Sequence, residues 1–227
     1  MRRTVVPELL DSDSGTPQEV EDSLADLRMF NRYFGGAHTM TALLTAVAHA
    51  TQLKRMSFLD VAGASGDVAL VSGKALQRNG IELRPVVLDR AESHLNGSIP
   101  SVCGDALALP FRDRSFDVVG CSLFVHHLEP DEIVHFAREG LRVARYAFVI
   151  NDLIRHPLHL ALVYAGFPLY RSRITRHDTV ASVRRAYTSS EMRRMLEQSG
   201  ATEAEIRMFY LFRMGVIAWK LQRPSTI

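Results

Sequence analysis

The sequence predicts an α/β fold built on a mostly parallel sheet, and three features of the 227-residue chain support this prediction. From Phe58 onward, apolar runs of strand length alternate with helical segments, which is typical of a parallel sheet covered on both faces. A turn of small residues, Ala62 to Gly66, joins the first strand to a helix. The first three strands each end at or just before an aspartate, namely Asp60, Asp89 and Asp105. Because the carboxyl ends of such strands line one crevice, these side chains should converge there.

Apolar spacing and turn residues give the expected place of each later element. Strands are expected near Phe58, Val86 and Val102, over Val118 to Leu123 and over Tyr146 to Ile150, with helices over Val68 to Gln77 and Asp131 to Val143. Thr188 and Glu191 have capping-box spacing, which predicts a helix to Gln198. Two final strands, Glu205 to Phe212 and Met214 to Leu221, are predicted to form a hairpin connected at Arg213.

The N-terminal part of the chain precedes this alternating pattern. Glu8 to Ser23 is rich in Asp, Ser, Gly, Pro and Glu, which predicts a flexible or loosely docked arm. Apolar spacing predicts helices over Leu24 to Phe34 and Met40 to Leu53. We therefore expect an N-terminal arm with cap helices over residues 1–54 and a main domain over residues 55–227.

An insertion at about residues 153–187 separates the fifth strand from the capped helix and is too long for a plain connection. Its first part, Leu158 to Tyr170, is apolar on nearly all sides. A helix there is either buried on several sides or faces a lipophilic ligand. Both interpretations stay open at this point. If the helix faces a lipophilic ligand, Leu162 and Phe167 are expected to bind an aromatic, prenyl-bearing or alkyl-bearing substrate, and the insertion is a lid.

Composition bounds the class of protein. Hydrophobic residues make up 47% of the chain, enough for one substantial core. With 27 basic and 25 acidic residues, the charge is nearly balanced, so no nucleic-acid partner is expected. The two cysteines, Cys103 and Cys121, lack the spacing of metal ligands, so buried thiols and no metal site are expected. The absence of a signal region and of a long apolar run favours a cytoplasmic protein without stable membrane insertion.

The turn and the three aspartates resemble those of class I S-adenosylmethionine (SAM) dependent methyltransferases, and the resemblance runs from about Phe58 to the C-terminus. It implies a Rossmann-like, seven-stranded, mostly parallel sheet with an antiparallel last strand, N-terminal helices and a helical insertion after strand 5. It also implies SAM as the cofactor. The residues implied to bind SAM are Asp60, Ala62, Gly63, Ala64 and Gly66 at the turn, Asp89 and Arg90 at the ribose, Asp105 and Ala106 at the adenine, and Ser122.

One other function stays open because of the composition of the turn, and a second is weighed against it. The family usually has glycine where this chain has Ala62 and Ala64. Each added Cβ costs about 1 kcal/mol wherever the backbone needs a positive φ. A SAM-binding protein without transferase activity is therefore one alternative. The rival NAD-dependent dehydrogenase is disfavoured, because the G-x-G-x-x-G spacing is missing and NAD binding gives no reason for the segment from Asp105 to Phe111, although Asp89 stands where an acid is needed.

Methyl transfer needs alignment and exclusion of water, and it needs a base only for a hydroxyl or an unactivated carbon acceptor. The candidate catalytic residues are His127, which is preferred, His126 and Asp152, all at strand ends. Arg28 and Tyr33 on the first helix are candidates to reach SAM or substrate, and a plain polar helix face is the equally open interpretation.

Two short segments narrow the expected substrate class. Phe124 to Leu128 and Val149 to Leu153 resemble segments of bacterial methyltransferases that tailor phenolic lipids, polyketides and quinones in secondary metabolism. This resemblance implies O- or C-methylation of a small, lipophilic, phenolic or quinone-like acceptor. Neither the acceptor nor the oligomeric state follows from the sequence.

Overall fold

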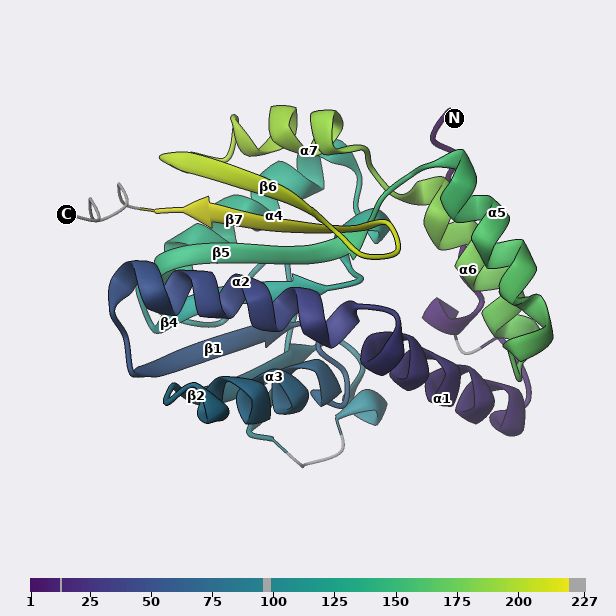
Figure 1. Ribbon diagram of the computed structural model, residues 1–227, viewed down its shortest axis with the longest axis horizontal. Helices are drawn as coiled ribbons and strands as arrows, with labels where there is room; N and C mark the ends of the chain where they lie inside the picture. The colour runs from purple at the N-terminus through teal and green to yellow at the C-terminus, as the bar shows by residue number, and fades with distance from the viewer. Residues whose placement is uncertain (13, 96–98, 221–227) are drawn as a thin grey trace.

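The computed structural model describes residues 1–12, 14–95 and 99–220 and confirms the α/β fold (Figure 1). Its seven-stranded sheet has the order β3-β2-β1-β4-β5-β7-β6. The strands are β1 (Arg55–Val61), β2 (Glu82–Asp89), β3 (Ser101–Cys103), β4 (Phe116–Ser122), β5 (Ala144–Leu153), β6 (Glu203–Phe209) and β7 (Arg213–Trp219). The strands from β3 to β5 pair in parallel, whereas β7 is antiparallel to both β5 and β6.

The last strand is antiparallel, as predicted, but it lies inside the sheet and not at its edge. β7 is buried along its whole length between β5 and β6. The turn before it uses Leu211 and Phe212, whose φ values are 56° and 58°. Arg213 therefore begins β7 and does not form the hairpin connection. The prediction that the connection lies at Arg213 was wrong, because the turn precedes this residue. The predicted strand end at Leu221 lies outside the described residues.

Helices cover both faces of the sheet (Figure 1). α2 (Gly36–Thr51) and α3 (Asp67–Arg78) pack together on one face, and α4 (Pro130–Val143) and α7 (Ser189–Leu196) pack on the other. Fully buried Met40, Phe58 and Trp219 belong to the first core, and Phe136 and Phe148 belong to the second. The predicted capping box opens α7, which ends slightly earlier than expected. Two complete apolar layers thus hold the strand ends in fixed positions.

The first helix begins earlier than expected. α1 (Pro17–Tyr33) starts within the segment predicted to be a flexible or loosely docked arm. Thr16 and Glu19 form a capping box there, and Pro17 occupies the first turn, where its missing N–H is tolerated. Both features are local, so the sequence contained the signal.

The residues before α1 are docked on the rest of the molecule, so the prediction of a flexible or loosely docked arm was wrong. The backbone N–H groups of Leu9 and Leu10 donate to the carboxylate of Asp178 at 2.8 and 3.0 Å. Arg3 forms an ion pair with Glu129 at 3.0 Å. These partners lie more than a hundred positions along the chain, so local composition could not reveal them. We call residues 1–12 the arm.

The insertion after β5 is helical, as predicted, and contains α5 (Pro157–Gly166) and α6 (Arg173–Arg185). α1 and α5 both pack against α6 beyond the carboxyl ends of the parallel strands (Figure 1). Asp26 of α1 is 1% exposed and accepts hydrogen bonds from the Arg171 N–H and the Thr175 hydroxyl. We call α1, α5 and α6 the cap. α2 belongs to the sheet layer, so the two N-terminal helices do not act together as a cap.

Among the residues that the structure describes, each helix is too short or too polar to cross a bilayer. The two cysteines differ from the expectation of buried thiols. Cys121 is buried in β4, whereas Cys103 is exposed at the end of β3. β3 is a short edge strand, which explains why its side chains stay accessible.

Two helical glycines should respond in opposite ways to replacement by alanine. A Cβ at Gly140 in α4 would lie 2.4 Å from the Phe148 ring, whereas a Cβ at Gly73 in α3 would meet Leu83 at an ordinary 3.7 Å. We expect Gly140→Ala to lower the free energy of unfolding by about 1 to 3 kcal/mol through overpacking. Gly73→Ala should raise it by about 0.5 to 1 kcal/mol through helix propensity. Denaturant unfolding measures both, and a stabilising Gly140→Ala would contradict the packing described here.

Candidate functional site

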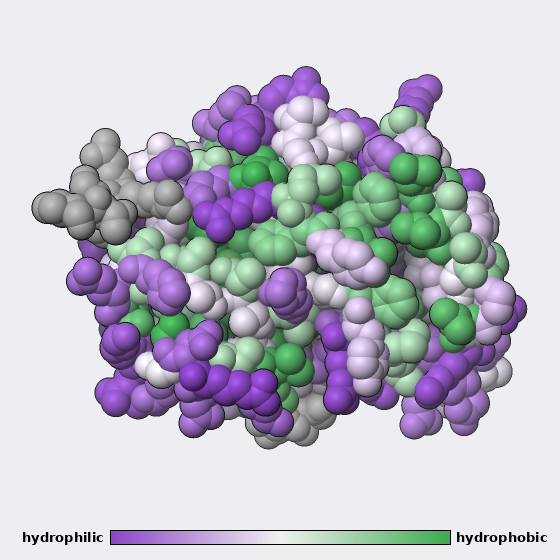
Figure 2. All heavy atoms as spheres, viewed as in Figure 1, coloured by the Kyte–Doolittle hydropathy of each residue, from purple (hydrophilic) through white to green (hydrophobic). Residues whose placement is uncertain are grey.

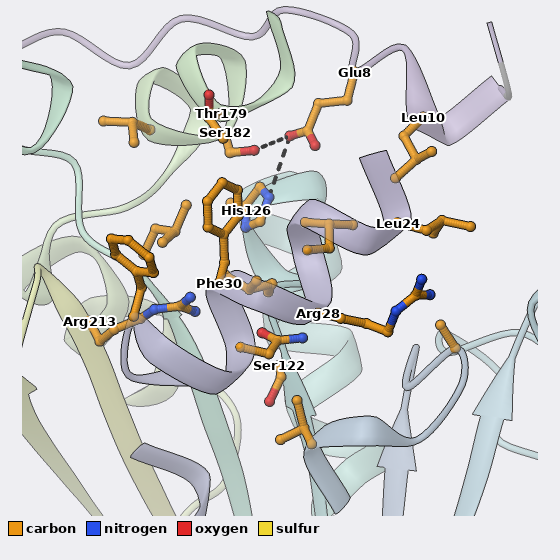
Figure 3. A pocket seen from close by; sticks show the side chains of 18 of the residues that line it. Glu8, Leu10, Leu24, Arg28, Phe30, Ser122, His126, Thr179, Ser182 and Arg213 are labelled. Carbon is orange, nitrogen blue, oxygen red and sulfur yellow. Dashed lines mark hydrogen bonds and ion pairs between the residues drawn. The ribbon is translucent and has the colours of Figure 1, made fainter. Parts of the chain in front are cut away.

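A cavity of about 380 Å³ lies between the cap and the carboxyl ends of β1, β4 and β5 (Figure 3). Residues of α1 and α5, and of the segments that follow these two helices, form its apolar wall: Leu24, Leu27, Phe30, Phe34, Leu162, Val163, Leu169 and Tyr170. Its polar groups come from the arm, α1 and the strand ends: Glu8, Asp11, Arg28, Asn31, Asp60, Ser122, His126, His127 and Arg213. The cavity thus joins the small-residue turn to a largely apolar chamber.

The turn after β1 forms as predicted, with alanines in strained positions. Ala62 and Ala64 have φ values of 55° and 45°, in the left-handed region that favours glycine. Gly63 is required for a different reason, because a Cβ there would lie 2.9 Å from the carboxyl carbon of Asp60. Asp89 holds the turn from the neighbouring strand by accepting a hydrogen bond from the Ala64 N–H at 3.0 Å. The turn therefore keeps the shape expected of it without the usual glycines.

Asp60 is a buried acid without hydrogen-bond donors. Its side chain lies at the end of β1, the residue is 1% exposed, and neither carboxyl oxygen has a partner among the described residues. Burial raises the pKa of Asp60 to about 8, and repulsion from Asp67 and Asp89 adds to the effect. Because an unpaired buried carboxylate is unfavourable, a cationic ligand group in the cavity would stabilise it.

The residues implied to meet the ribose and adenine lie beside the cavity and not in its wall. Asp89, Arg90, Asp105 and Ala106 follow β2 and β3, which lie on the opposite side of β1 from β4. Asp105 is exposed and accepts a hydrogen bond from the Leu107 N–H at 2.9 Å. Topology thus places these groups next to the turn, while the cavity extends the other way, toward β4 and β5.

A chain of buried polar contacts runs through His126. Its Nδ1 lies 2.7 Å from Asp152 Oδ1, and its Nε2 lies 3.4 Å from Glu8 Oε1. Figure 3 shows Glu8 between His126 and Ser182, whose hydroxyl donates to the same carboxylate at 2.9 Å. Burial alone would lower the pKa of His126, but the two carboxylates outweigh it and raise the pKa to about 10. His126 is therefore protonated at neutral pH.

His127 lines the same end of the cavity. Its Nδ1 lies 3.1 Å from Asp11 Oδ2, and its Nε2 lies 3.8 Å from Glu8 Oε2. Its side chain is 21% exposed, compared with 2% for His126. The two histidines share a short 3₁₀ turn, Val125–His127, so both rings point to Glu8 from one rigid segment.

Besides the ribose and adenine residues, four predicted site residues lie outside the cavity wall, namely Gly66, Asp152, Tyr33 and Phe167. Asp152 is 1% exposed and sits behind His126, where it can position the ring but cannot touch a ligand. Tyr33 is 66% exposed, and its ring packs against the Arg32 guanidinium instead. Phe167 packs against Tyr164 and Tyr170 within the cap. Arg28 and Leu162 do line the cavity, as do Asp60, Ala62, Gly63, Ala64 and Ser122.

Two sets of cavity residues were missed by the sequence analysis. Glu8 and Asp11 belong to the arm, and no local pattern ties them to the histidines. Arg213 is 3% exposed, and its Nη1 has no hydrogen-bond partner among the described residues. Burial lowers the pKa of Arg213 to about 10, although Asp152 opposes the shift. A lone arginine between two apolar strand segments was the available signal, because such a charge seldom lies in a buried strand without a function.

The fold and the turn define a class of proteins that bind a nucleotide-like cofactor at the carboxyl edge of a parallel sheet. Residues 59–146 match the family model for a methyltransferase domain. This match and the fold agree with the resemblance to class I SAM-dependent methyltransferases, and with SAM as the cofactor, that the sequence predicted.

Individual proteins are similar to this chain in sequence or in fold. The chain is 36% identical over 124 residues to a ubiquinone/menaquinone biosynthesis C-methyltransferase UbiE from Methylobacterium nodulans, a match that covers 48% of this chain and 47% of that protein. It thus matches about half the length of this curated relative. Two solved structures are similar in fold. They are the plantazolicin methyltransferase BamL (TM-score 0.65, 13% identity, 94% of each chain covered) and a SAM-dependent methyltransferase from Aquifex aeolicus (TM-score 0.52, 18% identity, 73% of this chain and 82% of that chain covered).

Replacing the strained alanines by glycine should stabilise the protein. The left-handed conformation costs alanine about 1 to 2 kcal/mol, and replacement by glycine removes this cost. Glycine also gives the unfolded chain more freedom, which lowers the stability by about 0.4 to 1 kcal/mol. We therefore expect Ala62→Gly and Ala64→Gly each to raise the free energy of unfolding by about 0.5 to 1 kcal/mol. Ala69→Gly in α3 is the matched control and should destabilise by about 1 kcal/mol. A loss of stability in both turn variants would show that the turn is not strained.

Proposed function

We propose that the protein transfers a methyl group from SAM to a small lipophilic acceptor that carries a hydroxyl or carbonyl oxygen, with a phenolic or quinone-like ring as the favoured class. The observation that carries this proposal is one continuous cavity that runs from the turn and Asp60 to the apolar wall of the cap. A cofactor at the turn and an acceptor under the cap would then face each other.

The residues at the turn suit SAM. Asp60 would hold the cationic ammonium of the methionine part, which supplies the partner that its buried carboxylate lacks. Asp89 would accept from the ribose hydroxyls with its remaining lone pairs, since each of its oxygens already accepts one backbone N–H, from Ala64 or Ala91. Asp105 and Ala106 would meet the adenine. When bound, SAM supplies a methyl group already activated by the sulfonium.

Strand order separates the cofactor end from the acceptor end. Arg213 begins β7, which is three strands away from β1 in the order β1-β4-β5-β7. With strands about 4.8 Å apart, its backbone lies at least about 14 Å from that of Asp60, because Arg213 is also four residues along β7 from Ile217, which is level with Asp60. Its guanidinium is therefore placed to bind an oxygen of the acceptor and not the methionine part of SAM. The apolar wall next to it suits the ring or chain of a lipophilic molecule, in keeping with the quinone named for the UbiE relative.

The polar end of the cavity would handle the proton of a hydroxyl acceptor. His126 is already protonated between Asp152 and Glu8, so it cannot act as a base near neutral pH. His127 is the group proposed to assist loss of the proton, since it lines the cavity and is more accessible. His126 and Asp152 would position it. The cap would exclude water from the methyl group.

The variant Asp60→Asn tests the SAM site through two opposite effects. We expect the variant to bind SAM at least about tenfold more weakly, because the interaction of an ammonium with a buried carboxylate is lost. The SAM-free variant should nevertheless be more stable than the wild type. In the wild type, the pKa of Asp60 is about 8 in the folded protein and near the ordinary 3.8 in the unfolded chain. The stability contributed by protonated Asp60 is therefore complete below pH 3.8 and is lost as pH rises through 8.

The stability advantage of Asp60→Asn should therefore grow by about 1 kcal/mol per pH unit between pH 4 and pH 8. Calorimetry with SAM and denaturant unfolding over this pH range measure both effects. Equal SAM affinity in a folded variant would remove Asp60 from the site. Turnover is tested separately, by incubating the wild type with SAM and a panel of phenols and quinols and detecting methylated product by mass spectrometry.

A pair of exposed leucines on α5 tests the acceptor chamber. Leu162 lines the cavity and Leu158 does not, although both are exposed to solvent, at 48% and 62% (Figure 2 shows the apolar surface over α5). We expect Leu162→Asn to raise the KM for a lipophilic acceptor by about tenfold, as expected from the loss of about 1.5 kcal/mol of apolar burial. Leu158→Asn should leave KM unchanged, and SAM affinity should stay constant in both. Equal KM values in the two variants would exclude Leu162 from the acceptor site.

A further inference from the structure

We propose that Glu8, His126 and His127 bind one divalent transition-metal ion of the Zn²⁺ or Fe²⁺ type at the polar end of the cavity. The sequence analysis predicted no metal site, because it considered only the cysteines. The three residues come together only in the folded chain, where the arm brings Glu8 onto the His126–His127 turn.

The spacing of the donor atoms suits a small ion. One ligand atom from each residue lies within 4.8 Å of the other two. Glu8 Oε1 is 3.4 Å from His126 Nε2, and Glu8 Oε2 is 3.8 Å from His127 Nε2. Ligands about 2.1 Å from a tetrahedral ion lie about 3.4 Å apart, so small rotations of the two rings and of the carboxylate complete the site. Two imidazoles with one carboxylate suit Zn²⁺ or Fe²⁺ and not Mg²⁺ or Ca²⁺, which prefer all-oxygen sites.

The second nitrogen of each ring already has the partner that metal-binding histidines use. His126 Nδ1 lies 2.7 Å from Asp152 Oδ1, and His127 Nδ1 lies 3.1 Å from Asp11 Oδ2. A carboxylate on Nδ1 keeps a proton on that nitrogen, so that Nε2 faces the ion, and it makes the ring more basic. The ion would displace the proton that Nε2 of His126 carries in the metal-free protein. Both histidines show this arrangement, and both direct Nε2 toward the same Glu8 carboxylate.

The charges around the rings favour a cation at this point. Three carboxylates, from Glu8, Asp11 and Asp152, surround the two imidazoles, and the Arg185 guanidinium lies 3.8 Å from Asp11. Glu8 and Asp152 are almost inaccessible to water, with side chains 10% and 1% exposed. A divalent ion would compensate these buried charges, and the Ser182 hydroxyl would hold the Glu8 carboxylate in place.

A metal with three protein ligands keeps an open position, which is the arrangement of catalytic and not structural sites. All three ligands line the cavity, so that position would face the acceptor. There the ion would bind the acceptor's hydroxyl or carbonyl oxygen and favour the ionised form of a hydroxyl. This role rests on the proposed function, whereas metal binding does not. As a ligand of the ion, His127 would assist loss of the proton from the acceptor hydroxyl without accepting that proton itself.

Metal binding is tested on the full chain without SAM or acceptor. Protein treated with a chelator and dialysed is titrated with Zn²⁺ in a calorimeter, and Co²⁺ is added to a second sample to record its visible absorption bands. We expect one Zn²⁺ per chain with a Kd in the micromolar range or below, and Co²⁺ bands typical of low coordination number. Glu8→Gln and His127→Ala should each weaken Zn²⁺ binding by about 100-fold and abolish the Co²⁺ bands.

Two further variants separate a metal site from a general loss of structure. His49→Ala removes an exposed histidine on α2, away from the cavity, and should bind Zn²⁺ like the wild type. Asp11→Asn keeps the shape of the side chain that orients His127 and should weaken binding by about 10- to 100-fold. Circular dichroism checks that each variant is folded.

The outcomes distinguish this inference from the proposed function. Folded wild-type protein that binds neither ion, or variants that bind like the wild type, would overturn the metal site and leave Glu8 and His126 as an ion pair that fastens the arm. Methylation of an acceptor by chelator-treated protein, unchanged by added Zn²⁺, would also overturn it while the proposed function stands. Zinc binding without methylation of any acceptor would support the metal site and count against the proposed function.

Discussion

The contact on which the rest of the site depends is the buried pairing of His126 with Asp152 on one side and Glu8 on the other. It ties together three segments that are distant in sequence: the end of β5, the turn after β4 and the arm. Removing one partner of a buried ion pair leaves an unpaired charge and typically costs about 3 to 5 kcal/mol. The ordered arm, the closed polar end of the cavity and the direction of His127 all follow from this pairing.

Other acidic side chains around the cap also join distant segments, because they accept hydrogen bonds from backbone N–H groups or hydroxyls. Asp178 of α6 holds the arm at Leu9 and Leu10, and Asp26 of α1 holds the chain at Arg171 and Thr175. Each of these acids is nearly buried, so each hydrogen bond forms in an environment where water competes poorly. The apolar chamber is thereby fixed by a small number of directed contacts, although its wall is made of side chains that have no directional preference.

The sequence allowed the fold and half of the site to be predicted because those parts depend on neighbouring residues. The strand that ends at Asp60, the turn and α3 are consecutive, and the capping box at Thr188 lies within four residues. The convergence of Asp60 and Asp89 follows from a general rule for parallel sheets. The arm, Glu8 and Arg213 were missed because their partners lie far along the chain. Tyr33 and Phe167 were misjudged because an aromatic residue in or next to a cap helix can face the chamber, the cap or the solvent, and composition does not distinguish these directions.

The charges of the cavity are arranged along its length, and this arrangement links stability to ligand choice. Within the described part of the chain, neither oxygen of Asp60 at one end has a donor, and Nη1 of Arg213 at the other end has no acceptor. Both groups are unfavourable in the free protein, since each is buried and the pKa of each is shifted toward its neutral form. A ligand pair that is cationic at the first end and anionic at the second relieves both penalties. A sulfonium cofactor beside an acceptor oxygen has that polarity, so the instability built into the two ends of the cavity selects for the pair of molecules that the proposed reaction needs.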